Sequence, residues 1–429
     1  MPGEEEHFAY RPVMDPINLT TNMKNAFKSL FNVLVTTGAL IMALPIKAES
    51  TNNVPKLVQG NNTFAFDLYS RVNAGKENEN LCFSPYSIST CLAMTYAGAR
   101  GETELQMAKA LHFTTNQAQL HAGFATLQKQ LNEAEKQQGI KLNVANALWA
   151  QQGHPFLPAF LQIAQQNYDA RVNQVDFRTQ SESARKEIND WVSKKTNGKI
   201  EEIIPSGALD AMTKLVLVNA IYFKGQWATQ FNKSRTAPAD FSISSSQKVQ
   251  AQLMNLKSRF KFADRGNFQL LEMPYKGNEL SMVVLLPKEV EGTQKLESML
   301  HPKELSDWLS QAASPEVNVF LPKFKINAGF ELGQPLAAMG MTDAFTAKAD
   351  FSGMDGTRDL FISSVIHKAF VEVNEEGTEA AAATGITMSR TAAVHAPPTF
   401  RADHPFLFLI RDMKSGSILF MGRVTDPTK

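Results

Sequence analysis

Residues 375–384 read Glu375-Glu376-Gly377-Thr378-Glu379-Ala380-Ala381-Ala382-Ala383-Thr384, directly after an alternating, strand-like stretch. If these residues are extended, successive side chains point to opposite faces. One face then carries only small, uncharged side chains, those of Thr378, Ala380, Ala382 and Thr384. A segment with such a face can enter between two existing strands without a clash. The pattern therefore predicts a loop that can become a strand.

Four consecutive alanines also favour a helix, because alanine has the highest helix propensity. Gly377 and Gly385 flank this run, and Ile386 and Thr387 after it are β-branched. A helix here would therefore be short and weakly supported. Both interpretations stay open on composition alone, and a marginal helix would not prevent later insertion as a strand.

The rest of the chain is typical of one large globular domain. It has 429 residues, 43% of them hydrophobic, which is enough for a substantial core. After residue 50 there is no internal repeat and no linker rich in glycine or proline, so we expect a single domain over residues 49–429. The formal net charge of +1 gives no reason to expect nucleic acid as a partner.

The N-terminal residues have the pattern of a secretory signal peptide, which we assign to residues 23–48. Met23 is followed by lysines, an apolar stretch and the small residue Ala48, where we expect cleavage. Polar residues interrupt the apolar stretch, so we expect no membrane association after signal removal. Residues 1–22 would then be an unstructured or artefactual extension before a true start at Met23. If Met1 is the start, the signal is internal. The pattern predicts secretion, to the extracellular space or the periplasm.

Two cysteines, Cys82 and Cys91, are too few for a disulfide framework in an exported protein of this size. Both lie among apolar and hydroxyl residues. We expect buried free thiols, with a disulfide between the two as the alternative.

Apolar periodicity predicts an α+β fold. Apolar residues recur every three or four positions in the ranges 62–72, 87–97, 104–111 and 184–195, which we interpret as helices. Runs rich in Val, Ile, Leu and Phe predict strands at 215–223, 280–286, 317–326, 360–373 and 406–410. Helices come mostly early and strands mostly late, unlike the regular alternation of a doubly wound parallel sheet.

The sequence shows no catalytic or cofactor motif. It lacks a glycine-rich dinucleotide fingerprint, a complete phosphate loop and a Gly-x-Ser-x-Gly nucleophile elbow. Its eight histidines show no zinc-binding spacing. We therefore expect no enzyme activity, no cofactor and no metal, although a triad of residues distant in the sequence would escape such a search.

Several ordered motifs are similar to those of the serpin family, and the resemblance spans about residues 56–426. They include Phe83-Ser84-Pro85-Tyr86-Ser87-Ile88, Gly98-Ala99-Arg100-Gly101-Glu102-Thr103, Thr196-Asn197-Gly198-Lys199-Ile200, the run 218–227 ending in Gly225-Gln226-Trp227, Phe400-Arg401-Ala402-Asp403-His404-Pro405-Phe406 and Gly422-Arg423-Val424. The resemblance implies the serpin fold, in which early helices pack on large, mostly antiparallel sheets and a reactive-centre loop is exposed.

In the family, a protease cleaves this loop and forms an acyl-enzyme, and the cleaved loop then inserts as a new central strand. The protease is carried along, is distorted and cannot deacylate. About a dozen new backbone hydrogen bonds at about 1 kcal/mol each would release on the order of 10 kcal/mol. The resemblance therefore implies a metastable native state and a monomeric suicide inhibitor of serine proteases.

The resemblance also assigns residue roles. Residues 375–384 match the hinge, where Gly377 lets the backbone fold over as insertion begins and Thr378 enters first. Trp227 matches the breach, where insertion starts. Without the resemblance, Trp227 and His367 would be interpreted as ordinary core residues. Each can be a core residue and also take part in the insertion of the loop. The shutter, a polar cluster under the sheet, is matched by Ser84, Ser87, Asn219 and His367.

The reactive bond follows from the family's spacing. Counting seventeen residues from Glu375 places it at Thr391–Ala392, which suits the small apolar pocket of an elastase-like protease. Arg390–Thr391 is the alternative, because a trypsin-like pocket recognises arginine. The segment from Thr391 to the next predicted strand is slightly longer than in many family members, so this choice of register stays open.

Two other functions stay open. One is a non-inhibitory serpin that serves as a carrier or chaperone; such members often have bulky, charged or proline residues on the inserting face, and here that face has none. The other is inhibition of cysteine proteases, which requires the same loop.

Overall fold

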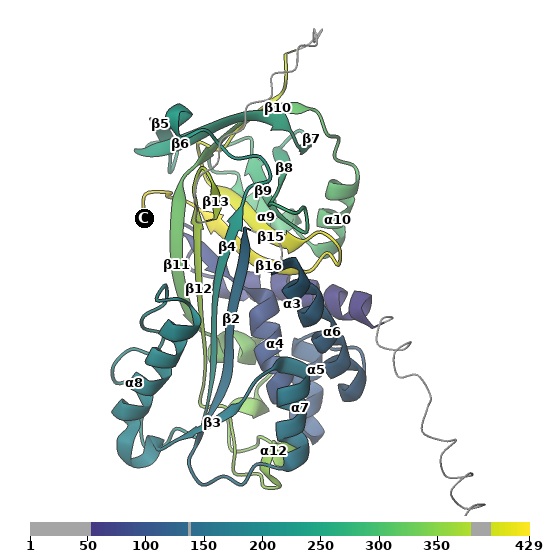
Figure 1. Cartoon of the computed structure of the whole chain (residues 1–429), viewed down its shortest axis with the longest axis vertical. Coiled ribbons are helices and arrows are strands. Elements are labelled where there is room, and N and C mark those ends of the chain that lie inside the picture. The colour runs from purple at the N-terminus through teal and green to yellow at the C-terminus, as the bar shows by residue number, and fades with distance from the viewer. Residues whose placement is uncertain (1–52, 136–138, 379–395) are drawn as a thin grey trace, which may run out of the picture. The chain divides into compact units, whose positions relative to one another are not determined.

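The computed structural model describes residues 53–135, 139–378 and 396–429 (Figure 1). All of them lie within one compact unit, Ser50–Lys429. None of the helices in these ranges is long and apolar enough to cross a membrane.

The longer helices come first in the described chain. They are α3 (Val54–Val72), α4 (Pro85–Tyr96), α5 (Gly101–Ala110), α6 (Gln117–Glu135), α7 (Pro158–Tyr168) and α8 (Phe177–Lys195). Shorter ones lie between later strands: η1 (Lys233–Arg235), α9 (Thr293–Met299), α10 (Pro302–Ser310), α11 (Gly333–Ala338), η2 (Asp343–Phe345) and α12 (Ser352–Asp355). The four predicted helices are present, with α3 and α8 starting earlier than predicted.

The central sheet has the strand order β11-β12-β4-β2-β3, and the two-residue strand β13 pairs with β4. β4 runs antiparallel to β2 but parallel to β12. The bounds are β2 (Ile140–Gln151), β3 (Val172–Val175), β4 (Leu215–Gln226), β11 (Phe324–Glu331), β12 (Ser364–Val373) and β13 (Gly377–Thr378).

Two further sheets complete the fold. One has the order β1-β16-β15-β9-β8-β7, and the other has the order β14-β10-β6-β5. Their strands are β1 (Leu81–Phe83), β5 (Ala237–Ser242), β6 (Lys248–Arg259), β7 (Lys261–Asp264), β8 (Phe268–Pro274), β9 (Leu280–Pro287), β10 (Glu316–Pro322), β14 (Thr399–Arg401), β15 (Phe406–Asp412) and β16 (Ile418–Val424). Helices and mostly antiparallel sheets together confirm the predicted α+β class.

The predicted strand 317–326 is wrong as one element. It is split into β10 and β11, which belong to different sheets, with only Lys323 between them. Apolar residues continue across the break, so periodicity alone could not locate it. The amide of Lys323 instead donates to the carbonyl of Gln252, at 2.9 Å. The predicted strand 360–373 also begins later than predicted, at Ser364.

β4 is buried on both faces, which explains its continuous apolar sequence. Leu215 and Leu217 belong to the main core, which includes α4, whereas Val216 and Val218 belong to a second core with α8. Helices therefore cover both faces of the central sheet, with α8 on one side and α4 on the other (Figure 1).

Cys82 and Cys91 are free and buried, as predicted. Burial raises the pKa of both thiols, that of Cys91 to about 12. Neither thiol is therefore a reactive thiolate at neutral pH.

Candidate functional site

The chain turns back on itself directly after β12, at the start of the predicted hinge. The amide of Asn374 donates to the carbonyl of Gly377, and the amide of Gly377 donates to the carbonyl of Asn374, at 2.8 and 3.2 Å. Gly377 has a φ of +143°, and a Cβ at this position would lie 1.9 Å from the carbonyl oxygen of Gly225. Only glycine fits this close approach between two backbones.

The turn places β13 against β4. Gly377 pairs with Gln226 and Thr378 pairs with Gly225, and the two strands run antiparallel. Because β2 pairs with Gly225 along the other edge of β4, β13 occupies the edge that faces β12. The first two residues of a strand antiparallel to β4 are thus already in place.

The seam between β4 and β12 is open at this end. The two strands pair over Val216–Tyr222 and Ser364–Phe370, and the pairing ends there. Beyond it, β4 continues to Gln226 and meets β13 instead (Figure 1). The sheet therefore has a preformed point of entry between β4 and β12.

A set of contacts that we call the hinge clamp holds Glu375 and Glu376 at this entry point. The backbone amides of Trp227 and Phe231 donate to the carbonyls of Glu376 and Glu375, both at 2.8 Å. The indole N–H of Trp227 donates to the carbonyl of Asn374 at 3.0 Å. These bonds hold the backbone carbonyls of Asn374, Glu375 and Glu376 before either glutamate side chain contributes.

Two lysines complete the hinge clamp. Lys323 pairs with Glu375 at 3.0 Å, and Lys233 pairs with Glu376. Both carboxylates are 6% exposed, whereas the lysines are 41% and 65% exposed, so each pair has one buried and one solvated partner. Burial alone would raise the pKa of Glu375, but hydrogen bonds from its own backbone, from Lys323 and from Thr236 outweigh it and lower the pKa. The Glu375 carboxyl is therefore held as an anion.

The predicted breach residue Trp227 is buried beside the hinge clamp. Its ring stacks on Tyr275 with a centroid distance of 4.7 Å and an interplanar angle of 7°, and it meets Phe231 edge-on at 6.4 Å. Trp227 is thus a core residue that also contacts the hinge.

The structure brings the four predicted shutter residues together. The amide of Ser84 donates to Nε2 of His367 at 3.0 Å, so that nitrogen is unprotonated. Nδ1–H of His367 then donates to Oδ1 of Asn219. The amide nitrogen of Asn219 donates to Ser87. These bonds fix His367 as one neutral tautomer.

Asn146 is a fifth member of this cluster and was missed in the sequence. Its side-chain oxygen accepts hydrogen bonds from Asn219 and, at 3.3 Å, from the hydroxyl of Ser87. Asn146 lies on β2, Asn219 on β4 and His367 on β12, so the shutter spans three strands and the start of α4. Burial lowers the pKa of His367 to about 3, so it stays neutral near neutral pH.

A second feature missed in the sequence crosses the same seam on the α8 side. The ammonium of Lys368 on β12 donates to the carbonyl of Glu202 at 2.7 Å. The amide of Asn143 on β2 donates to the carbonyl of Lys195 at 3.1 Å. The end of α8 and the segment after it are therefore tied to strands on both sides of the seam.

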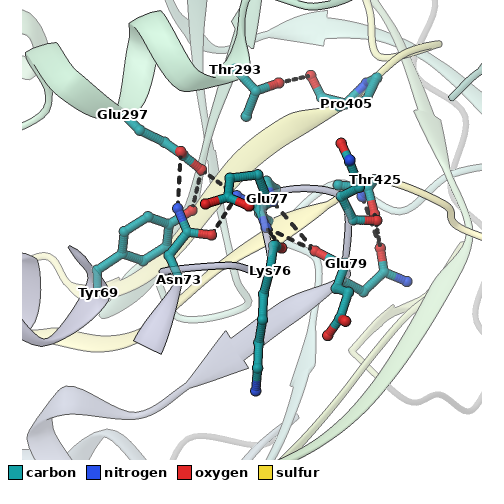
Figure 2. Close-up of polar contacts among 12 residues, drawn as sticks. Tyr69, Asn73, Lys76, Glu77, Glu79, Thr293, Glu297, Pro405 and Thr425 are labelled. Atoms are coloured by element: carbon teal, nitrogen blue, oxygen red, sulfur yellow. Dashed lines mark hydrogen bonds and ion pairs between the residues drawn. The ribbon is translucent and has the colours of Figure 1, made fainter. Parts of the chain in front are cut away.

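A separate polar cluster anchors the C-terminal strand β16. Buried Arg423 donates to Glu297 at 2.7 Å and to Asn73 at 2.8 Å. Figure 2 shows Tyr69 and Asn73 converging on Glu297, and the Tyr69 hydroxyl donates to Glu297 at 2.6 Å. Burial raises the pKa of Tyr69, so this hydroxyl stays a donor. β16 follows both possible reactive bonds, so this cluster would hold the C-terminal part after cleavage.

Several predicted site residues lie outside the described residues. These are Glu379, Ala380, Ala381, Ala382, Ala383 and Thr384 of the hinge, and Arg390, Thr391 and Ala392 at the reactive bond. Within the described ranges, no group of three or more His, Cys, Asp or Glu side chains could hold a metal ion.

Comparisons with known proteins agree with this geometry. A family model described as "Serpin (serine protease inhibitor)" matches residues 59–427. The leukocyte elastase inhibitor of Bos taurus is 43% identical over 380 residues, which cover 87% of this chain and 100% of that protein. The leukocyte elastase inhibitor of Sus scrofa is 44% identical over 381 residues, with the same coverage.

Solved structures show the same likeness. Uncleaved ovalbumin superposes with a TM-score of 0.80 at 33% identity, over 87% of this chain and 100% of that chain. Human thyroxine-binding globulin complexed with thyroxine superposes with a TM-score of 0.81 at 33% identity, over 88% of this chain and 100% of that chain.

Proposed function

This chain belongs to the serpin family, and on that premise we propose that residues 375–384 are its inserting hinge and Thr391–Ala392 its reactive bond. The protein is an inhibitor of serine proteases that acts as a suicide substrate. The observation that carries the assignment of the hinge is the position of β13, which already pairs with β4 on the edge that faces β12.

The topology supplies a driving force for insertion. β4 and β12 are parallel neighbours, and parallel pairing is slightly less stable per residue than antiparallel pairing. A strand that continues from β13 between them runs antiparallel to both. Insertion therefore replaces one parallel interface with two antiparallel ones, in addition to the new hydrogen bonds.

We propose an elastase-like protease as the target. Thr391 followed by Ala392 suits a small apolar pocket, and the relatives named above are called leukocyte elastase inhibitors. Arg390–Thr391 is the alternative bond, and it would redirect the inhibitor to trypsin-like proteases. A carrier role is disfavoured because the face that enters the sheet carries only threonine and alanine.

We further propose that the protein is exported as a monomer after cleavage of residues 23–48. The signal-like pattern of these residues supports this proposal. Expression of the full chain, followed by N-terminal sequencing of the secreted product, tests the processing. A product that begins near Glu49 supports export, whereas a product that stays in the cell with residues 23–48 attached contradicts it.

The inhibitory mechanism is tested with residues 49–429, incubated separately with elastase and with trypsin. We expect a complex with elastase that survives denaturing electrophoresis, and a released C-terminal peptide that begins with Ala392. A peptide that begins with Thr391 would move the reactive bond to Arg390. Cleavage in the loop by both enzymes without any complex, and without a rise in melting temperature, would contradict the trapping mechanism.

A further inference from the structure

A groove of about 440 Å³ lies at the end of the seam opposite to β13, where β4 and β12 begin (Figure 1). Residues just before β4 line one side of it, and residues just before β12 line the other. Two hydrogen bonds close the seam here. The amide of Ser363 donates to the carbonyl of Leu215 at 2.8 Å, and the amide of Lys214 donates to the hydroxyl of Ser363 at 2.9 Å. The hinge clamp and the shutter contribute no residue to this groove.

The groove exposes apolar surface. Met212 in its lining is 71% exposed, the largest exposed fraction among the large apolar side chains in the described ranges. Phe345 and Phe361 also line the groove and are only partly buried. Apolar side chains that are exposed together at the end of a sheet are suited to contact with a further segment of chain.

The groove also carries negative charge, from Asp210 and Glu331. Oδ1 of Asp210 accepts from the amide of Met212 at 2.9 Å, and both carboxylate oxygens of Glu331 accept from the amide of Gly333 at 3.0 Å. These donors are neutral, and within the described ranges neither carboxylate forms an ion pair. An arginine fits such a groove, because its methylenes cover apolar surface while its guanidinium stacks on rings and binds carboxylates.

The register of β13 decides which residue of the loop reaches this groove. Thr378 pairs with Gly225, and in an antiparallel pair each later residue of the loop lies opposite an earlier residue of the partner strand. Twelve residues further along the loop and twelve residues back along the partner, Arg390 lies opposite Thr213. Thr213 lines the groove. Arg390 is also the only lysine or arginine in residues 379–395. The register and the charge therefore select the same residue.

We propose that, after cleavage at Thr391–Ala392 and insertion of the loop, Arg390 docks in this groove between Asp210 and Glu331. The inference rests on the proposed function and on that reactive bond. Arg390 is then a positioning residue, which holds the end of the inserted strand instead of filling the specificity pocket of the protease.

Docking of Arg390 limits the movement of the trapped protease. The serine of the protease is joined by an ester to Thr391, the residue after Arg390. Residues 389–391 extend past the start of β4, which leaves a slack of about 10 Å at about 3.3 Å per residue. Slack lets the protease regain its active geometry. Water then attacks the ester carbonyl of Thr391, the bond to the serine oxygen breaks, the serine regains its proton, and a carboxylate is left on Thr391. A docked Arg390 removes most of the slack, so the complex lasts longer.

The docking is tested by the lifetime of the purified complex with elastase. Asp210→Asn/Glu331→Gln removes both charges and keeps the shape of the side chains. We expect its complex to release active elastase about threefold faster than the wild-type complex, measured as the return of elastase activity. The control, Glu289→Gln/Glu304→Gln, neutralises two carboxylates that do not line the groove and should release elastase at the wild-type rate. Equal release from the wild-type complex and the Asp210→Asn/Glu331→Gln complex would overturn the proposal.

A reversal of charge separates docking from a structural role of the two carboxylates. Asp210→Lys/Glu331→Lys places like charges around Arg390, so we expect a shorter lifetime of the complex. Arg390→Glu added to these two changes makes the charges complementary again and should lengthen the lifetime about threefold. Because the lifetime is measured on purified complex, it does not depend on how fast the protease recognises the loop. No gain from the added Arg390→Glu would also overturn the docking.

The outcomes distinguish this inference from the proposed function. A wild-type complex whose released peptide begins with Thr391 would support inhibition but overturn the docking, because Arg390 would then lie inside the protease. If wild type formed no complex, the proposed function would fail, and unfolding of the loop-cleaved proteins in guanidinium would decide the docking. Cleavage should then raise the unfolding midpoint more in wild type than in Asp210→Asn/Glu331→Gln. An equal rise in both would overturn the docking.

Discussion

The seam between β4 and β12 is held at two places by different chemistry. The hinge clamp at its open end uses two ion pairs, each between a buried glutamate and a solvent-exposed lysine. The shutter further along the seam uses a neutral histidine, asparagines and serines, all bonded to one another below the surface. Water and salt can weaken the ion pairs of the clamp. The hydrogen bonds of the shutter are buried, so they break only when the strands separate. The two regions should therefore respond differently to mutation, acid and salt.

The largest effect is expected where the chain enters the seam, at Thr378→Arg. The backbone of Thr378 already pairs with Gly225, and its side chain is predicted on the face that enters the core. A buried, unpaired charge would oppose insertion. We expect the variant to be cleaved as a substrate with no stable complex, measured as the stoichiometry of elastase inhibition.

Glu379→Arg is the matched control for this test, because residue 379 is predicted on the opposite face. It should trap protease as wild type does. If Thr378→Arg trapped protease with an unchanged stoichiometry, the entry point that we assign to β13 would be incorrect.

The second effect concerns the shutter alone. Asn219→Ala removes the acceptor of His367 and the donor to Ser87 and Asn146, which leaves several buried polar groups unpaired. We expect a loss of about 2–4 kcal/mol in the free energy of unfolding, measured by denaturant titration. Asn255→Ala, which removes one half-buried bond to the carbonyl of Val319, should cost less than about 1 kcal/mol. Similar losses for the two variants would mean that the shutter contributes little to stability.

These two regions also show how much of the site could be predicted from the sequence. The four predicted shutter residues do meet in space, and they were found because they lie in the motifs that resemble those of the serpin family. Asn146 was missed because β2 has only a weak alternation of apolar and polar residues, so the strand itself was not predicted. The lysines of the hinge clamp were missed for a different reason. Lys233 and Lys323 are far from Glu375 and Glu376 in the sequence, and a surface lysine carries no signal of its partner.

Acid should weaken the two regions in different pH ranges. The pKa of His367 is depressed from 6.5 to about 3, so the unfolded state binds a proton before the folded state does. The stability that depends on neutral His367 is therefore present above pH 6.5 and declines as the pH falls toward 3. The pKa of Glu375 is also depressed, so the contribution of its ion pair declines only below its ordinary pKa of 4.5.

Unfolding titrations of wild type and His367→Gln between pH 7 and 4.5 separate these contributions. We expect wild type to lose stability faster than the variant over this range, while Glu375→Gln should follow wild type until about pH 4.5. His121 is also buried with a pKa lowered to about 4, so some decline should persist in His367→Gln. Parallel curves for wild type and His367→Gln would mean that His367 is not held neutral by the fold.

The smallest effect on stability is expected from the lysines of the hinge clamp. Lys323 is 41% exposed, so Lys323→Met should cost about 1 kcal/mol or less in the free energy of unfolding. Salt should weaken the wild-type clamp in the same way, because exposed charges are screened within about 10 Å at 0.1 M ionic strength. The shutter has no such charges, so Asn219→Ala should show the same loss at low and high salt. Lys288→Met, at an exposed pair with Asp264, is the control for general charge effects.

A small stability loss at the clamp is compatible with a clear kinetic effect. The clamp holds Glu375 and Glu376 at the open end of the seam, so its release frees the hinge to extend into the sheet. We expect the uncleaved loop of Lys323→Met to insert into the sheet faster than that of wild type on incubation at 37 °C, which would inactivate the inhibitor. The measurement is the loss of elastase inhibition together with a rise in melting temperature. Lys288→Met should lose activity at the wild-type rate. If Lys323→Met kept its activity as long as wild type did, the remaining contacts of the clamp would be sufficient to hold the hinge, and the Lys323–Glu375 ion pair would have no part in controlling insertion.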